Sequence, residues 1–338
     1  MDRRNVLRAA LGAGIWASVA PLAAMSGCKR GVVTGPPLRL GLSDWPGHAP
    51  FYGAQKLGMF APATVEIKSF SSNFDRNRAF AKKNLDALAT PLFDALKIAD
   101  GGADLKIVLL FDYSAGGDGI VGAQGIGGIS DLRGKRVSAE LGAITHFVLL
   151  SALKTAGLRE NDVQIVNLSV PEGVEAFKTG KVDAATVWDP HLSRLAALPG
   201  ARKIFTSKDI PGQVIDVLIV QNELAKSRPQ DVEALLRGWE RSMRLWREKP
   251  ADHEALMATQ MPGRTAASLH EDFQGLELLD LAANARLFKD GSNGPSARRS
   301  FEETSAFMTQ AKLFEERPRV ASELLDPQFM EHVLADKV

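Results

Sequence analysis

From residue 38 onward, short apolar runs alternate with segments of helical periodicity. The apolar runs predict strands at 38–43, 64–70, 87–90, 105–111, 119–122, 136–140, 163–169, 184–188 and 214–220. The segments between them predict helices at 49–58, 73–83, 91–99, 144–156, 171–180 and 190–197. Strands that alternate with helices in this way are typical of βαβ units. The pattern therefore predicts an α/β fold with mainly parallel sheets and helices on both faces.

After residue 222 the pattern becomes helical. Long periods of three and four residues predict helices over 229–249, 265–288 and 300–314. Ser300 and Glu303 have the spacing of a capping box, which predicts that the last of these helices begins there. We therefore expect a helical C-terminal part that packs back on the first sheet.

The first 28 residues predict an export signal. Arg3, Arg4 and Arg8 precede an uncharged segment, and Arg3-Arg4-Asn5-Val6-Leu7-Arg8 resembles a twin-arginine signal. Met25-Ser26-Gly27-Cys28 resembles a lipobox, whose Cys becomes the lipid-modified first residue of the mature protein. We expect an export signal over 1–27, lipidation at Cys28 and a tether over 28–37. A plain signal peptide or an uncleaved membrane anchor is the alternative.

The composition of the chain argues against several classes of function. Lys and Arg number 41 against 40 Asp and Glu, a formal net charge of +1, so no basic excess indicates a nucleic-acid partner. The single cysteine cannot form an internal disulfide or a CxxC site. The six histidines include no H-x-x-x-H pair. We therefore expect no catalytic residue, no metal and no cofactor.

Polar and aromatic residues gather directly after the predicted strands, where open α/β sheets bind ligands. The candidate ligand-binding residues are Asp44, Trp45, Pro46, Thr90, Ser114, Gly142, Thr145, Trp188, Asp189 and Asp216. The tryptophans can wall a small-molecule pocket. These loops hold no Arg or Lys, so an anion would depend on helix N-termini and hydroxyls. Their unpaired carboxylates favour an amine or ring N–H donor. Alternatively, the aspartates are helix N-caps and the tryptophans core residues.

Five segments, in this order, resemble the periplasmic solute-binding proteins of the nitrate, sulfonate and taurine ABC-transporter family. They are LGLSDWPGHAPFYGAQKLGMF (40–60), DLKIVLLFDYSAGGDGIVG (104–122), ISDLRGKRVSAELGAITHFVLLSALKTAGL (129–158), AFKTGKVDAATVWDPHLS (176–193) and SKDIPGQVIDVLIV (207–220). The resemblance implies the two-lobe, type II periplasmic-binding-protein fold with a discontinuous first lobe. Lobe 1 would comprise 38–120 and 221–338, and lobe 2 would comprise 121–220. Two hinge segments would lie near 119–122 and 217–221.

The resemblance also implies a function. The chain would be a monomeric receptor of an ABC importer, in the periplasm or at the cell surface, anchored by a lipid on Cys28. It would bind a small organic solute, sulfonate- or taurine-like, by hinge closure and deliver it to an ABC permease with its ATPase. An amino-heterocycle such as a pyrimidine vitamin precursor, or nitrate or bicarbonate, is the alternative ligand. A ligand sensor and a pyrimidine-synthase-like enzyme are the alternative functions, although such enzymes rely on a Cys-rich motif that is absent here.

Overall fold

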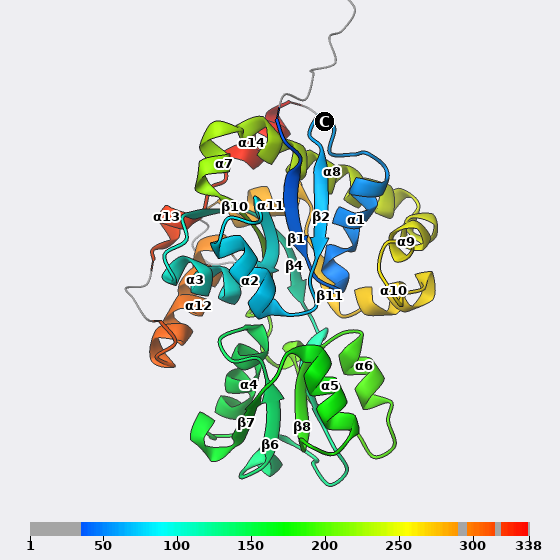
Figure 1. The fold of residues 1–338 in the computed structure, drawn as a ribbon, viewed down its shortest axis with the longest axis vertical. Coiled ribbons are helices and arrows are strands. Elements are labelled where there is room, and N and C mark those ends of the chain that lie inside the picture. Colours follow the sequence, from blue (N-terminus) through cyan, green and yellow to red (C-terminus); the bar gives the residue numbers. More distant parts are fainter. Residues whose placement is uncertain (1–34, 290–295, 315–318, 337–338) are drawn as a thin grey trace, which may run out of the picture. The chain divides into compact units, whose positions relative to one another are not determined.

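The strands of the computed structural model form two sheets (Figure 1). The structure describes residues 35–289, 296–314 and 319–336, which belong to one compact unit. The predictions for the export signal, for Cys28 and for most of the tether lie outside these residues. We call the residues built on the six-stranded sheet lobe 1 and those built on the five-stranded sheet lobe 2.

Lobe 1 has the strand order β11-β4-β10-β3-β1-β2. These strands are β1 (Leu38–Leu42), β2 (Val65–Ser69), β3 (Ala87–Pro91), β4 (Leu105–Ser114), β10 (Ile215–Gln221) and β11 (Leu276–Leu278). Lobe 2 has the order β7-β6-β8-β5-β9, with β5 (Asp118–Gly122), β6 (Arg136–Ala139), β7 (Gln164–Asn167), β8 (Ala184–Trp188) and β9 (Arg202–Thr206). The α/β prediction is confirmed, but β9 and β11 are absent from the predicted strands.

The sheets are mixed rather than mainly parallel. Strand β1 pairs in parallel with β2 and β3, and β6 pairs in parallel with β7 and β8. Strand β10 is antiparallel to β3 and β4, and β5 is antiparallel to β8 and β9. The reason is the connectivity: β5 and β10 each enter their sheet directly from the other lobe, without the helical crossover that a parallel pair requires.

The chain passes between the sheets twice, and we call these two connections the crossings. The first comprises residues 115–117, between β4 and β5. The second comprises residues 207–214, which begin with the 3-10 turn Ser207–Asp209. The predicted hinge positions, 119–122 and 217–221, lie within β5 and β10 rather than in these crossings. The predicted lobe boundaries, after residues 120 and 220, also fall inside these two strands.

Helices cover both sheets. In the first half of lobe 1 they are α1 (Ala49–Lys56), α2 (Asn73–Ala81) and α3 (Leu92–Asp100), and in lobe 2 they are α4 (Ile144–Thr155), α5 (Val170–Lys178) and α6 (His191–Ala196). The C-terminal part adds α7 (Asn222–Ser227), α8 (Pro229–Glu248), α9 (Pro250–Ala258), α10 (Ala266–Phe273), α11 (Leu281–Leu287), α12 (Ala297–Gln310), α13 (Ala321–Leu324) and α14 (Gln328–Ala335). As expected, this part packs on lobe 1, where α8 contacts α1 and α11 contacts β4.

Two details of the C-terminal prediction are wrong. The predicted helix over 265–288 is divided into α10, β11 and α11, because Leu276–Leu278 pairs with the edge of β4 and Asp280 caps a new helix. The last long helix begins at Ala297 with Ser296 as its N-cap, so Ser300 lies within the helix. Within the described ranges, no helix is both long and apolar enough to cross a membrane.

An aromatic cluster fixes lobe 1 behind the sheet edge that faces lobe 2. The rings of Phe51 and Trp239 have centroids 4.6 Å apart, and Phe111 lies 5.5 Å from Phe51 and 5.6 Å from Trp239. The indole N–H of Trp239 donates to the carbonyl of Leu279 at 2.9 Å, which satisfies its one polar atom. The cluster therefore holds α1, β4 and α8 together beneath the residues that form the candidate site.

Candidate functional site

A narrow cavity lies between the two lobes. It is lined by Ser43, Trp45, His48, Asn73, Arg76, Pro91 and Asp216 of lobe 1, by Asp118, Ile144 and Trp188 of lobe 2, and by Val214 of the second crossing. About 20 Å³ is open to the centre of a water-sized sphere, room for about one water molecule. Three predicted site residues, Trp45, Trp188 and Asp216, thus share this cavity, and Pro46 begins the adjoining turn Pro46–His48.

The predicted site residues leave out several residues of the cavity lining, among them His48, Asn73, Arg76 and Asp118, and of these Arg76 carries the positive charge. Its side chain is 2% exposed, and its Nη2 donates to Thr90 Oγ1 at 2.9 Å and to Asp94 Oδ2 at 3.2 Å. Thr90, a predicted ligand residue, therefore positions this guanidinium. The loops after the strands hold no Arg or Lys, as stated above, but Arg76 supplies a cation to the cavity from helix α2, which that reasoning did not consider. Burial lowers the pKa of Arg76 and raises that of Asp94 to about 6.

A sequence signal for Arg76 does exist. Asn73, Arg76 and Phe80 are the buried residues of α2, and they recur at the three- and four-residue spacing of its inner face. A charged residue at such a position is rarely buried without a partner. Polar residues on the core-facing side of a helix beside a predicted ligand edge would therefore have identified this position.

Three buried carboxyl groups stand on the other side of the cavity or directly behind it. Asp112 and Asp216 are opposite one another in the β4–β10 pairing, close enough for each to affect the pKa of the other, and Asp118 begins β5. Burial raises the pKa of Asp112 to about 7 and that of Asp118 to about 8, and it raises that of Asp216 well above its usual range. At neutral pH this group therefore retains protons and can accept a positive charge by releasing them.

Trp45 is fixed by this acidic group. Its indole N–H donates to Asp112 Oδ2 at 2.9 Å. Gly47 lies directly against the same contact, since a Cβ atom there would stand 1.7 Å from Asp112 Oδ2. A side chain at residue 47 would therefore separate Trp45 from Asp112, and the absence of one allows the indole to form a rigid cavity wall.

Two neutral donors complete the lining. Burial lowers the pKa of His48 to about 3, so its ring is neutral. The Ser43 N–H donates to His48 Nδ1 at 3.0 Å, which assigns the ring proton to Nε2. That Nε2 atom and Asn73 Nδ2 are buried, and neither has a hydrogen-bond partner in the described part of the chain. Unpartnered buried donors are costly, so both are available for a ligand acceptor.

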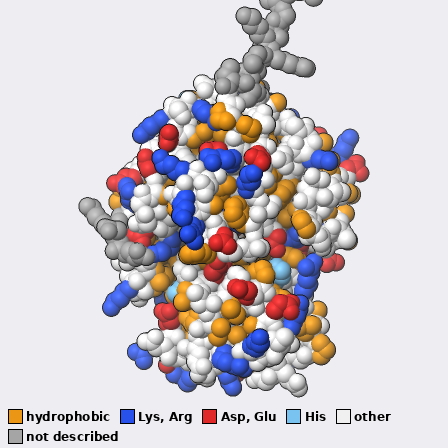
Figure 2. All heavy atoms as spheres, viewed as in Figure 1, with side chains coloured by type: hydrophobic (Ala, Val, Ile, Leu, Met, Phe, Trp, Pro, Cys, Tyr) orange, Lys and Arg blue, Asp and Glu red, His pale blue; other side chains and the backbone are white. Residues whose placement is uncertain are grey.

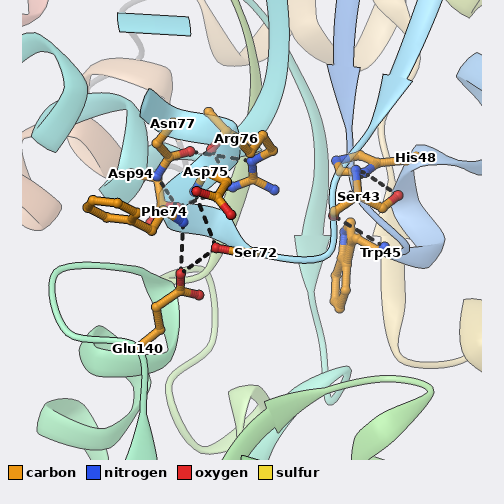
Figure 3. A network of polar contacts seen from close by, with 11 residues as sticks. Ser43, Trp45, His48, Ser72, Phe74, Asp75, Arg76, Asn77, Asp94 and Glu140 are labelled. Carbon is orange, nitrogen blue, oxygen red and sulfur yellow. Dashed lines mark hydrogen bonds and ion pairs between the residues drawn. The ribbon is translucent and has the colours of Figure 1, made fainter. Parts of the chain in front are cut away.

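The lobes are joined by side chains on either side of the cavity. Glu140 of lobe 2 accepts from Ser72 Oγ at 3.2 Å and from the Phe74 N–H at 2.8 Å, at the start of α2 (Figure 3). Asp44 of lobe 1 contacts Trp188 Nε1 at 3.2 Å and His191 Nε2 at 3.1 Å. On the face shown in Figure 2, acidic side chains gather near the level where the two lobes meet.

Asp44 is therefore placed as a link between lobes rather than as a free cavity carboxylate. Burial by itself would raise its pKa, but the hydrogen bonds from His191 and Trp188 outweigh burial, and the pKa of Asp44 lies below its usual range. Its backbone carbonyl also accepts from Arg264 Nη2 at 2.5 Å. The ionised side chain of Asp44 thus contacts lobe 2, while its backbone carbonyl contacts the C-terminal part.

The other predicted residues serve local structure. Thr145 Oγ1 accepts from the Glu140 N–H at 2.9 Å, and Asp189 Oδ1 accepts from the Ser193 N–H at 2.8 Å at the start of α6. Gly142 has φ of +77° and lines a separate surface depression. The structure therefore does not bring these three residues into the cavity lining, and Asp189 has the helix-start role that was the alternative for the aspartates.

Ser114, also predicted, lies where the first crossing begins. Its Oγ accepts from the Asp118 N–H at 3.1 Å and lies 2.8 Å from Ser207 Oγ. It therefore connects the backbone at the start of β5 to the second crossing. Among the described residues, no group of three or more His, Cys, Asp or Glu side chains is placed to hold a metal ion.

Two mixed sheets joined by two crossings, with a cavity between them, define the two-lobe periplasmic-binding-protein fold. The chain belongs to the NMT1-like family, which matches residues 34–260. It is 31% identical over 179 residues to the "Taurine-binding periplasmic protein" of Escherichia coli K12, covering 51% of this chain and 54% of that protein. It is also 29% identical over 133 residues to an E. coli "Putative aliphatic sulfonates-binding protein", covering 39% of this chain and 41% of that protein. The chain thus spans about half the length of these curated relatives, or less.

Solved structures share the fold. The alkanesulfonate-binding protein SsuA from Xanthomonas axonopodis pv. citri bound to MOPS matches with a TM-score of 0.71 and 18% identity, covering 86% of this chain and 98% of that one. The desulfurization enzyme DSZB matches with a TM-score of 0.65 and 17% identity, covering 90% and 100%. The fold is therefore common to a binding protein and an enzyme, so the function has to be inferred from the residues of the cavity rather than from the fold.

Proposed function

We propose that this chain is the periplasmic solute-binding receptor of an ABC importer and that its ligand is a small zwitterion of the taurine type. The observation that carries the proposal is the charge arrangement of the interlobe cavity. A buried guanidinium, Arg76, lines the same small space as the buried carboxyl groups of Asp118 and Asp216. The names of the curated relatives support the same ligand class.

The anionic end of the ligand binds at Arg76. A sulfonate there accepts from the guanidinium, from Asn73 Nδ2 and from His48 Nε2, and the hydrogen bonds from Arg76 are charge-assisted. Both neutral donors are without a partner in the described structure, so the sulfonate would satisfy them. Taken together, these groups favour an oxyanion with several acceptor oxygens over a neutral acceptor.

The cationic end binds at the carboxyl groups. An ammonium placed between Asp118 and Asp216 lowers their pKa values, so binding at neutral pH releases a proton from this group. Trp188 and Trp45 flank the same space and can face the cation. Because Arg76 belongs to lobe 1 while Asp118 and Trp188 belong to lobe 2, one zwitterion bridges both lobes.

That bridging explains closure. The cavity shown is too small for an organic solute, so the lobes separate at the two crossings to admit one. The ligand then favours a closed arrangement that is wide enough to hold it, through simultaneous contacts with both lobes. The links at Glu140 and Asp44 form at the same time. Under this proposal the division predicted from the sequence is kept, with the hinge moved to 115–117 and 207–214.

The test is a thermal-shift and calorimetric panel on the purified protein. Taurine should raise the unfolding temperature by mass action, and ethanesulfonate, which lacks the ammonium, should bind at least tenfold more weakly. Arg76→Met should abolish binding of both compounds, and the double variant Arg76→Met with Asp94→Asn, which leaves no unpaired carboxylate, controls for misfolding. Absence of a shift with taurine and with related amino-sulfonates would contradict the proposal.

An amino-heterocycle is the second candidate. Arg76 is already paired with Asp94, so the acidic groups outnumber the free positive charge in the cavity. Two tryptophans are suited to a flat ring, and the carboxyl groups to its amino substituents. Binding of an aminopyrimidine with no binding of taurine would select this candidate and keep the receptor assignment.

We further propose binding without catalysis. Burial lowers the pKa of His48 to about 3, so the ring is a weak proton acceptor and is poorly matched to general-base catalysis at neutral pH. The chain has one cysteine, Cys28, at its proposed lipid attachment point. Export by the twin-arginine route, anchorage through Cys28 and a monomeric state complete the proposal. Labelling cells with palmitate should mark the wild type and not Cys28→Ser, and labelling of both would refute the anchor.

A further inference from the structure

A second and larger cavity lies on the crossings themselves. Its volume is about 570 Å³, within the range of about 300–1,000 Å³ that small-molecule sites occupy. Ser114, Ala115, Ser207, Lys208, Pro211 and Gly212 form one wall, at and beside the crossings. Tyr113 and residues of β11 and α11 form the other. It shares none of its lining residues with the interlobe cavity.

The lining is apolar at its base and positive at its rim. Leu279, Ala283 and Leu287 give it an aliphatic floor. Lys208 and Arg286 are exposed, and in the described ranges neither has an ion-pair or hydrogen-bond partner. Glu277 is the one carboxylate in the lining, so the two cations leave a net positive charge. The Tyr113 hydroxyl is buried and makes no hydrogen bond of standard length to the described residues.

The wall on the crossings is a built structure rather than a loose gap. Ser207 Oγ accepts from the Gly116 N–H at 2.7 Å and lies 2.8 Å from Ser114 Oγ. The Ala115 N–H donates to the carbonyl of Gly275 at 2.7 Å. These bonds join both crossings to each other and to the segment before β11. The cavity is therefore bordered on this side by segments that hold one another in place.

We infer that this cavity, which we call the crossing site, binds a small amphipathic organic anion, an aryl or alkyl sulfonate or carboxylate. Its apolar body lies against Leu279, Ala283 and Leu287, which removes that surface from water. Its anionic group lies at the rim between Lys208 and Arg286, where both cations gain a partner. Neither the apolar contact nor the contact with the two cations depends on what the interlobe cavity binds.

The probe is 8-anilinonaphthalene-1-sulfonate, titrated by fluorescence against the full protein. We expect one saturable site. Ala283→Trp, which fills the floor, and Arg286→Glu, which reverses the rim charge, should each weaken binding at least fivefold. Arg244→Glu, at an exposed helical arginine outside the cavity, should change binding less than twofold. Lys208→Glu gives an independent test of the rim if Ala283→Trp fails to fold.

A variant of the other cavity separates the two sites. Trp188→Ala alters the interlobe cavity, and it should change affinity for the probe less than twofold. A loss with Trp188→Ala equal to that with Arg286→Glu would place the probe between the lobes and overturn the inference. So would unchanged binding in the crossing-site variants, or the absence of saturable binding, whatever the interlobe cavity proves to bind.

Discussion

Replacing Asp118 by Asn should change how the stability of the protein depends on pH. Asp118 is 4% exposed, and its pKa is about 8, first because of burial and then because Asp216, Asp189 and Asp94 stand nearby. In the unfolded chain an aspartate has a pKa of about 3.9. Asn keeps the size of the side chain but cannot ionise. The variant therefore removes one titration from a site whose shape is preserved.

The sign follows from proton linkage. Below about pH 4 both states are protonated and this group has no effect on the pH dependence. As the pH rises from about 4 to about 8, the unfolded state has lost its proton while the folded state keeps it, so stability falls by up to about 1.4 kcal/mol per pH unit. The full difference of about four pKa units corresponds to at most about 5–6 kcal/mol. Relaxation around the charge reduces this, and we expect at least about 2 kcal/mol between pH 5 and pH 8.

The assay is urea unfolding at constant ionic strength, followed by tryptophan fluorescence and circular dichroism at pH 5, 6, 7 and 8. The difference in free energy of unfolding between Asp118→Asn and the wild type should increase with pH in favour of the variant. Asp75→Asn, at an exposed position of α2, controls for the loss of one carboxylate. Parallel pH profiles for Asp118→Asn and the wild type would refute the burial and charge argument.

Three further outcomes are expected. Gly47→Ala should destabilise the protein by about 1–3 kcal/mol in urea unfolding, because the new methyl group would stand 1.7 Å from Asp112 Oδ2, and an unchanged midpoint would contradict this. Glu140→Ala should shift the protein without added ligand toward open lobes, which small-angle scattering would detect as a larger radius of gyration. Glu140→Gln, which keeps one acceptor oxygen, should shift it less. Equal scattering profiles for Glu140→Ala and the wild type would exclude Glu140 as a link between the lobes. Asn284→Ala should cost about 2–4 kcal/mol, because Asn284 bonds both the N–H and the carbonyl of Leu110 in the core, at 2.8 and 2.7 Å. A thermal transition within 1 °C of the wild type would show that those bonds are dispensable.

Secondary structure was predicted best for segments whose apolar residues are also the ones buried in the structure. The strands at 105–111 and 184–188 were found because each is a mainly apolar run, interrupted only by Lys106 or by Thr186, that becomes buried in its sheet. The segment 265–288 was misread because its apolar residues keep helical spacing on both sides of a strand only three residues long. The pairing of Leu276–Leu278 with β4 is a long-range contact that overrides this local pattern.

The site was predictable only as far as it lies on strands or on the loops that directly follow them. Trp45, Trp188 and Asp216 follow strands or lie in one, and the rule of strand ends located them. Arg76 was missed because it lies within a helix, and its burial depends on Thr90 and Asp94, which are distant in sequence. The pairing of Asp112 with Asp216 likewise arises from the antiparallel register of β10, which no local pattern encodes.

The position of β10 imposes an order of events on folding. This strand lies between β3 and β4 at the centre of the six-stranded sheet, yet it is made only after the whole of lobe 2 has been synthesised. Until residue 221 is available, β3 and β4 lack the strand that joins them, whereas β5 to β9 already form a complete set. Lobe 2 can therefore assemble first, and lobe 1 closes around a returning segment across a long loop. Pairing strands that are far apart in sequence is slow, and it leaves strand edges exposed in the meantime. A protein that binds the incompletely folded chain would therefore be expected to cover β3 and β4.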